Sequence, residues 1–215
     1  KAYTRAERVL ELSDPACGLR WWVLAAIGRV ESNHGQYQGV TLADDGFGSR
    51  PIRGVALDGR GDVAKVVDTD GGALDGDETF DRAMGPMQFI PETWEAVGVD
   101  ADGDGERNAD NIFDAAVGAG VYLCSGGGDL GDPAALREAL HRYNPSDAYV
   151  DEVMYLARAY ESGDGVGGLD FGSPDGGYAY DGPGSYVSPY DDDYYDFDSD
   201  YYDDDLGFDY EVELP

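Results

Sequence analysis

Three short segments of the 215-residue chain carry side chains suited to chemistry on a polar substrate. In the first, an apolar stretch at residues 21–30 leads directly into Glu31 and Ser32. At helical spacing Glu31 follows Ile27 and Val23, so its carboxyl group would lie against apolar surface. Desolvation raises the pKa of such a group and keeps a proton available for general acid catalysis. The alternative is a solvated helix end, because helices often end in polar residues.

The second segment is AMGPMQFIPETW, residues 83–94, in which a glycine and a proline interrupt the chain just before Gln88. The amide of Gln88 can both donate and accept hydrogen bonds, and therefore suits sugar hydroxyls or an N-acetyl group. The rings of Phe89 and Trp94 could stack on the faces of a sugar. Alternatively, they are core residues around a turn.

The third segment is HRYNPSDAYV, residues 141–150. Tyr143 and Asn144 come where an expected helix meets Pro145. A phenol and an amide at this position suit the binding of a polar ligand. The alternative is that the Asn-Pro pair simply ends the helix, which is a common arrangement.

These segments need a scaffold, and the hydrophobic pattern predicts a mainly helical one. Between the first two segments, residues 36–84 are rich in Gly and Asp and predict a long loop. Loops of that length inside a domain are commonly functional. Pro91 and Pro133 stand at first helical positions, and Asp132 is the expected N-cap of the second of these helices. The expected helices are 2–12, 19–30, a short one within 86–97, 111–124, 133–143 and 149–160.

The net charge is −31, from 45 acidic and 14 basic residues. Such a balance argues against nucleic acid or anionic lipid as a partner. No apolar run approaches the ~20 residues of a membrane span. Residues 164–215 hold 16 acids, no Lys or Arg, and nine of the 16 tyrosines. Because this composition cannot bury a core, we expect a domain at 1–162 and a disordered acidic tail at 163–215.

Taken in order, these segments resemble a known family. Glu-Ser at a helix end, Gly-x-Met-Gln-Phe about fifty residues later, and Tyr-Asn after a further helix are similar to three motifs of lytic transglycosylases. The resemblance is to the membrane-bound lytic murein transglycosylase B type, in the secreted form of high-GC Gram-positive bacteria, and spans residues 2–160. The segments that carry it are CGLRWWVLAAIGRVESNHG, DRAMGPMQFIPETW, NIFDAAVGAGVYLC and YNPSDAYVDEV.

The resemblance implies a lysozyme-like transglycosylase domain that cleaves the MurNAc–GlcNAc β-1,4 bond of peptidoglycan without a catalytic cofactor. Glu31 would protonate the glycosidic oxygen and then take the proton of the muramic acid C6 hydroxyl, which closes a 1,6-anhydro ring. The other implied roles are a hydrogen bond near the acid for Ser32, sugar positioning for Gln88 and Asn144, stacking for Phe89, and orientation of the acid for Tyr143.

A conventional glycosidase needs two carboxylates, and the acids of the long loop could supply the second. These candidates are Asp44, Asp45, Asp68 and Asp70. Two other functions therefore stay open, a lysozyme-like hydrolase of the same bond and a non-catalytic wall-binding module. For the enzyme we expect glycan strands as the partner, a monomer, and a location outside the cytoplasm, secreted or attached to the cell wall.

The loop that begins at Asp100 has aspartates at positions one, three and five and a glycine at six, like the first half of an EF-hand. Position twelve is Asn111 instead of Glu, and Asp114 could close a longer loop. A solvated acidic turn is the alternative. Some members of the resembled family have such a lengthened loop, which implies a structural Ca²⁺ held by Asp100, Asp102, Asp104, the Glu106 carbonyl and Asp114.

The acidic stretch DTDGGALDGD, residues 68–77, fits no calcium template and is expected to be a plain loop. The chain has two cysteines, Cys17 and Cys124. Composition alone leaves open whether they form a disulfide or are two small core residues. The family resemblance favours a disulfide, because an extracytoplasmic enzyme folds where disulfides persist.

Overall fold

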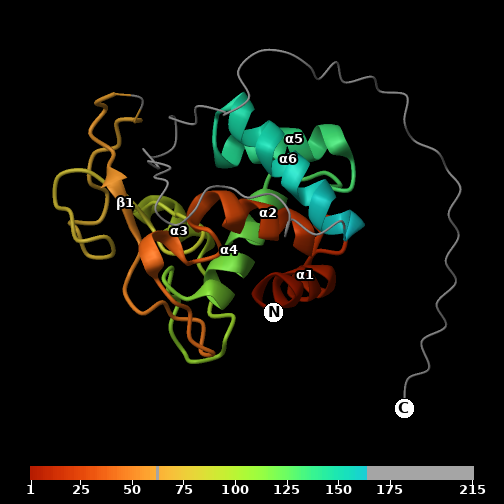
Figure 1. The fold of residues 1–215 in the computed structure, drawn as a ribbon, viewed down its shortest axis with the longest axis horizontal. Coiled ribbons are helices and arrows are strands. Elements are labelled where there is room, and N and C mark those ends of the chain that lie inside the picture. Colours follow the sequence, from red (N-terminus) through yellow and green to blue (C-terminus); the bar gives the residue numbers. More distant parts are fainter. Residues whose placement is uncertain (62, 164–215) are drawn as a thin grey trace, which may run out of the picture.

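The computed structural model describes residues 1–61 and 63–163, and helices form most of this part (Figure 1). The predicted acidic tail therefore lies outside the described residues, apart from its first position. Every helix expected from the sequence is present, with ends that differ by a few residues. The helices are α1 (Ala2–Ser13), α2 (Trp21–Ser32), α3 (Pro91–Val97), α4 (Ile112–Cys124), α5 (Pro133–Tyr143) and α6 (Asp147–Ser162).

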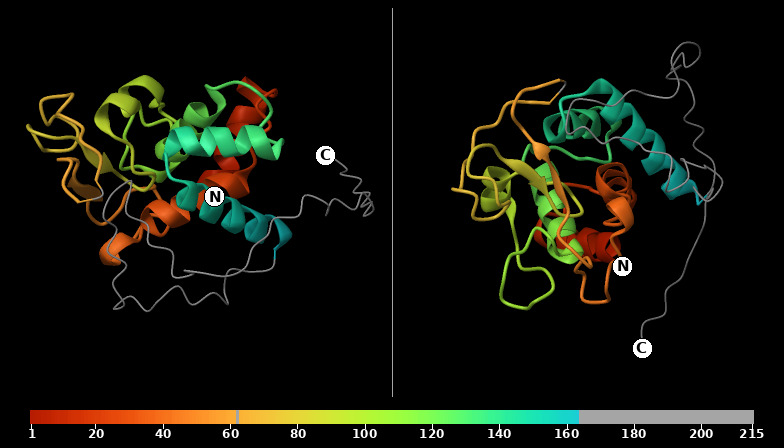
Figure 2. Two further views of the ribbon diagram at one scale, coloured as in Figure 1. Left: turned by 90° about the horizontal axis from the view of Figure 1, so that it is seen from above. Right: turned by 60° about the vertical axis from the view of Figure 1, so that its left-hand side comes forward.

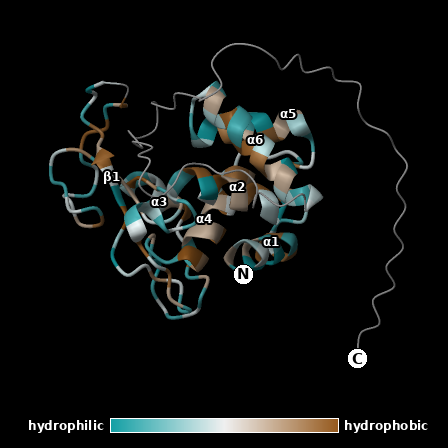
Figure 3. Ribbon diagram, viewed as in Figure 1, coloured by the Kyte–Doolittle hydropathy of each residue, from teal (hydrophilic) through white to brown (hydrophobic). Residues whose placement is uncertain are grey.

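The core forms where α2 packs between α6 and the pair α1 and α4. In Figure 3 the hydrophobic residues follow α2 and α4, while the long loops are largely hydrophilic. Small residues along α4 allow α1 to approach closely, since a methyl group on Gly120 would lie 2.2 Å from Cδ1 of Leu10. The close contact of the helices buries the apolar face of α2 and fixes where its last turn, with Glu31, is presented.

The segment between α2 and α3 contains more than the predicted loop. A short 3-10 turn (Tyr37–Gly39) is followed by β1 (Arg53–Ala56), which pairs antiparallel with β2 (Arg82–Met84). Figure 2 shows this pair and its connecting loop projecting to one side of the helices. These strands leave no signal in the sequence, because they are four and three residues long and have no regular alternation of buried positions.

A polar cap stabilises the start of α5, and a disulfide stabilises the end of α4. Asp132 caps α5 as predicted, accepting hydrogen bonds from the backbone N–H groups of Ala134 and Ala135 at 2.9 and 3.0 Å. Cys17 and Cys124 are joined, with their Cα atoms 5.5 Å apart. This bond confirms the expected pairing and ties the segment before α2 to the end of α4.

Within residues 1–61 and 63–163, none of the helices combines the length and apolarity needed to cross a membrane.

Candidate active site

Glu31 lies in the last turn of α2, and its side chain is buried although it can ionise. The residue is 5% exposed. Its Oε1 accepts a hydrogen bond of 2.8 Å from the hydroxyl of Tyr149, in the first turn of α6. The burial agrees with the apolar surroundings inferred from the sequence. Tyr149 was missed, although its place on the apolar stripe of the last helix with Val150 and Val153 is visible in the sequence.

The turn after β2 is fastened to the end of α2 by Ser32. The Ser32 hydroxyl donates to the carbonyl of Pro86 at 2.6 Å and accepts from the N–H of Gly35 at 2.7 Å. At Gly85 the backbone has φ 70°, and a Cβ atom would lie 1.8 Å from the Ala109 carbonyl oxygen. Only glycine fits there. Ser32 is thus next to the acid, as predicted, and its hydrogen bonds hold the turn that carries Gln88.

Gln88 is presented at the cleft in a strained backbone conformation, with φ 51°. Its Nε2 donates to the Gly85 carbonyl at 2.8 Å, which leaves the amide oxygen for other partners. Among the described residues that line this cleft, Glu31 is the one acid. The lining residues are Glu31, Tyr37, Gln38, Arg53, Gly54, Val55, Arg82 and Gln88.

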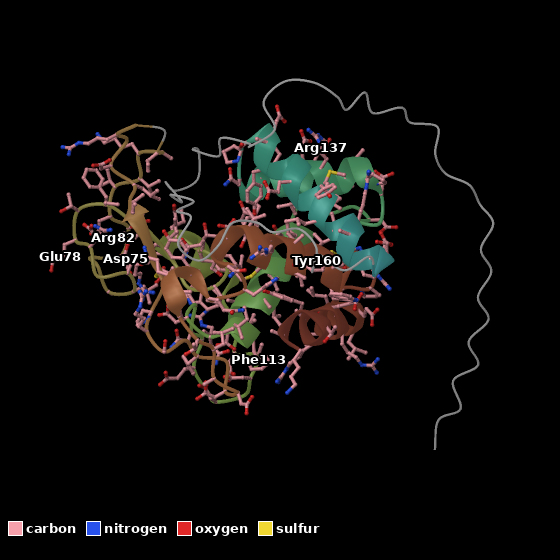
Figure 4. All side chains as sticks on the ribbon, in the orientation of Figure 1. Asp75, Glu78, Arg82, Phe113, Arg137 and Tyr160 are labelled. Carbon is pink, nitrogen blue, oxygen red and sulfur yellow. A yellow bond between two sulfur atoms is a disulfide. The ribbon has the colours of Figure 1, made fainter. Side chains whose placement is uncertain are left out.

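Two arginines from the strand pair form the wall of the cleft, and nothing in the sequence marked them. Arg53 makes two hydrogen bonds to the Asp110 carboxylate, at 2.6 and 2.9 Å. Arg82 pairs with Asp77 at 2.8 Å, and its backbone N–H donates to Asp75 at 2.6 Å. Backbone N–H groups and then Arg82 lower the pKa of Asp77. Figure 4 shows Arg82 and Asp75 together on this side of the molecule.

The predicted stacking role of Phe89 disagrees with the structure. Phe89 is 3% exposed, and its ring packs against Trp94 and Tyr143 with centroids 5.3 and 6.0 Å apart. A ring enclosed by two others has no free face for a sugar. The core interpretation of these aromatic residues was therefore the correct one, and Phe89 supports the turn from beneath.

Tyr143 and Asn144 both lie close to the candidate acid, in different settings. The Tyr143 hydroxyl donates to the Met87 carbonyl at 2.7 Å. Burial and then the charge of Glu31 raise the pKa of Tyr143. Asn144 is 6% exposed, and its Oδ1 has no hydrogen-bond partner in the described part of the chain. The hydroxyl of Tyr149 bonds Glu31. Orientation of the acid by Tyr143 and sugar binding by Asn144 stay predictions.

His34, to which the sequence gave no argued role, joins three helices behind the site. Its Nδ1 lies 3.0 Å from the hydroxyl of Tyr3 in α1, and its Nε2 lies 3.0 Å from the hydroxyl of Tyr160 in α6. Burial and then the positive charge of Arg29 lower the pKa of His34 to about 4. A neutral imidazole, with one donor and one acceptor nitrogen, bridges two hydroxyls that can each take either role.

The structure brings together part of the predicted calcium set. Oxygen atoms of Asp100, Asp102 and Asp114 lie within 4.8 Å of one another, whereas Asp104 is outside this group. Asp114 is 1% exposed, and burial raises its pKa, with Asp102 adding to the effect. Three converging carboxylates, one of them buried, offer the oxygen ligands that Ca²⁺ favours, so the residues fit the ion. The N–H of Glu106 donates to Asp104 at 2.8 Å, and the role of the Glu106 carbonyl as a calcium ligand stays a prediction.

A second acidic group joins the stretch expected to be a plain loop, residues 68–77, to Asp81. Oxygen atoms of Asp68, Asp70 and Asp81 also lie within 4.8 Å of one another. Asp81 is fully buried, and it accepts hydrogen bonds from the N–H and hydroxyl of Thr69 at 2.9 and 2.8 Å. None of these acids lines the cleft. Asp44 and Asp45 do not line it either, and both are exposed.

Part of the chain matches a known family model, and the fold is similar to that of solved structures. Residues 79–139 match the family model of the transglycosylase SLT domain, a stretch that includes Gln88 but not Glu31. The structure is similar to the Escherichia coli lytic transglycosylase Slt35, solved in complex with bulgecin A. The TM-score is 0.50, with 16% identity over 75% of this chain and 72% of that one. The domain therefore has the lysozyme-like fold of a lytic transglycosylase, as the sequence predicted.

A second solved structure is SltB3 from Pseudomonas aeruginosa in complex with NAG-anhNAM-pentapeptide. The TM-score is 0.46, with 19% identity over 73% of this chain and 60% of that one. No curated protein matches the chain. The SLT-domain match therefore covers part of the described domain, and the likeness to Slt35 is one of fold.

Proposed function

We propose that this protein is a lytic transglycosylase that cleaves the MurNAc–GlcNAc β-1,4 bond of peptidoglycan and leaves 1,6-anhydro-MurNAc ends. The observation that carries the proposal is the buried Glu31, the one acid among the described residues lining the cleft. A carboxyl group in that setting can hold a proton and deliver it to the glycosidic oxygen as the bond from C1 breaks.

Among the described residues no second acid lines the cleft beside Glu31, which favours the anhydro product over hydrolysis. Glycosidases that use water need a second carboxylate, as nucleophile or base, a few ångströms from the acid. Here the acids of the long loop bond backbone N–H groups away from the cleft, as Asp68 and Asp70 do. The ionised Glu31 would instead accept the proton of the substrate's own C6 hydroxyl, whose oxygen then bonds to C1. Gln88 would hold the sugar beside the acid through its free amide oxygen.

The decisive experiment is product analysis on purified peptidoglycan with the wild type and Glu31→Gln. We expect the wild type to release muropeptides one water lighter than those with reducing ends, as measured by mass spectrometry. Glu31→Gln should lose about 10²–10⁴-fold of the rate, the usual contribution of a general acid or base. Glu138→Gln, which changes an exposed glutamate in α5, is the matched control and should keep full activity.

The other two functions predict different results. Products that carry only reducing ends would identify a lysozyme-like hydrolase. Unchanged lysis by Glu31→Gln would remove the catalytic assignment. Absence of any product, with retained binding to the wall, would identify a binding module.

The finer classification follows from the same proposal. We place the enzyme with the membrane-bound lytic transglycosylase B type, as a monomer acting on glycan strands outside the cytoplasm. The disulfide between Cys17 and Cys124 supports that location, because such bonds persist in oxidising compartments.

We also propose that the loop at Asp100, Asp102 and Asp114 binds a structural Ca²⁺. The ion would offset the repulsion among the three carboxylates and stabilise the loop before α4. At a calcium concentration about 100-fold above Kd, the expected gain in unfolding free energy is about 2.7 kcal/mol. Thermal unfolding with Ca²⁺, with Mg²⁺ and with a chelator measures it.

The second acidic group supplies the control for this test. Asp102→Asn should abolish the gain from Ca²⁺, whereas Asp70→Asn should keep it. A gain that disappears only in Asp70→Asn would move the ion to the other cluster. No gain for the wild type would contradict calcium binding.

A further inference from the structure

A hollow lined by both basic and apolar side chains lies beside the first helix, α1. Its floor is the ring of Phe113, and the guanidinium of Arg5 lies 5.7 Å from the centre of that ring. We call this surface the basic hollow, and it shares no residue with the cleft around Glu31. Its lining residues are Lys1, Thr4, Arg5, Arg8, Val9 and Phe113.

The cations of the basic hollow stand out in a chain whose net charge is −31. Other arginines of the described chain, such as Arg53 and Arg82, form ion pairs with aspartates. By contrast, the ion pairs found among the described residues include neither Arg5 nor Arg8, and no acid lines the hollow. Val9, 37% exposed, and Phe113 add apolar surface beside these charges. The hollow is therefore complementary to a segment with both carboxylates and aromatic rings.

The chain itself supplies such a segment. Residues 164–215 contain 16 acids and nine tyrosines but no Lys or Arg. Arg binds carboxylates through two parallel hydrogen bonds and also stacks on aromatic rings. Tyrosine offers a flat apolar ring with a polar tip, which suits a surface made of Phe113, Val9 and guanidinium groups.

This segment begins next to α1. Tyr160, in the last turn of α6, is linked to Tyr3 of α1 through His34, with 3.0 Å at each of the two contacts. Tyr3 and Arg5 are two positions apart on a helix and so lie on opposite sides of it. Figure 4 accordingly labels Tyr160 and Phe113 on the two sides of α1. The segment has to pass one helix width, about 10–12 Å, to reach the hollow.

The segment is long enough to make this crossing. The acidic run at 191–193 begins 28 residues after Gly163. A stretch of that length can reach at most about 90 Å, several times the width of a helix. A connection this short also keeps the local concentration of the segment near the millimolar range, so that modest affinity is sufficient.

We propose that the basic hollow is the docking site for residues 164–215 of the same chain. Docking neutralises the cations of the basic hollow and leaves the cleft at Glu31 open. The proposal does not depend on the reaction that the cleft catalyses.

Zero-length cross-linking of the full chain with a carbodiimide tests the proposal, because the reagent joins an amine to a carboxylate in contact. The chain has two lysines, Lys1 at the hollow and Lys65 in the loop between β1 and β2, and both are exposed. We expect peptides that join Lys1 to acids of 164–215 at several-fold higher yield than those that join Lys65. The preference should vanish at about 1 M salt, where charges are screened beyond about 3 Å.

Charge reversals give the matched comparison. Arg5→Glu and Arg8→Glu should each reduce the Lys1 cross-links several-fold. Arg60→Glu makes the same change at a side chain that is 89% exposed in the distant loop, and should leave the yield unchanged. Equal yields at Lys1 and Lys65, or yields insensitive to salt and to Arg5→Glu, would overturn the proposal.

A mixture of isotopically light and heavy chains identifies the occupant. Cross-links within one chain contain a single isotope at every protein concentration, and this is the expected outcome. Mixed-isotope peptides whose yield rises with concentration would show that a second copy supplies the segment, which would overturn docking within one chain.

Discussion

The hydroxyl of Tyr149 lies 2.8 Å from Oε1 of Glu31 and donates a hydrogen bond to it, across 118 positions of sequence. The bond joins the last turn of α2 to the first turn of α6. It restrains the carboxyl group at the edge of the cleft.

Replacing Tyr149 by Phe should slow turnover while preserving the fold. A hydrogen bond to a charged group contributes about 1.5–3 kcal/mol, so we expect kcat to fall about 10–100-fold. Tyr155→Phe, on the same helix and 56% exposed, is the control. Equal kcat values for the two variants would show that the bond has no role in catalysis.

Gln88 and Phe89 are adjacent but should respond to substitution in opposite ways. Phe89→Ala removes a ring that is 3% exposed, and should cost about 3–5 kcal/mol of unfolding free energy. Gln88→Ala should leave stability nearly unchanged and weaken substrate binding, because its amide faces the cleft. Chemical denaturation and steady-state kinetics on both variants measure this. A stable Phe89→Ala variant with a raised KM would revive the stacking role that its burial contradicts.

Protonation of His34 should destabilise the fold in mildly acidic solution. Its pKa is lowered from 6.5 to about 4 in the folded state. Stability from the neutral ring is thus complete above pH 6.5 and is lost as the pH falls from there toward 4. The change is at most about 3 kcal/mol. His34→Gln should lower stability at neutral pH and flatten its pH dependence in this window.

Denaturation midpoints measured from neutral to acid pH test the assignment to His34. His141→Gln replaces the other, exposed histidine and controls for loss of an imidazole. If His34→Gln kept the slope of the wild type through this window, another group would be responsible for it.

Breaking the disulfide should lower stability without altering the cleft. Cys17 and Cys124 are 107 residues apart, and closing a loop of that length restricts the unfolded chain strongly. For the double Ala variant we expect a loss of about 2–5 kcal/mol. The measurement is urea unfolding, with the wild type in reducing buffer as a second comparison. A loss of activity at temperatures where the variant is still folded would show that the bond also shapes the site.

The sequence predicted the local parts of this protein well. The apolar periodicity of α2 and α6 and the cap at Asp132 depend on neighbours within a few positions, which the order of residues specifies. Short strands such as β1 and β2 carry no such signal, because their stability comes from pairing with a distant segment.

By itself, therefore, the sequence determined the six helices, the place of Glu31 at the end of one of them, and the place of Gln88 in a turn. Only the tertiary structure decided which side chain touches which. It joined Tyr149 to Glu31, enclosed Phe89 in the core, and placed Arg53 and Arg82 on the wall of the cleft. The physical reason is that hydrogen bonding and burial depend on distances between residues far apart in the chain. Those distances are set by helix packing, which no local pattern records.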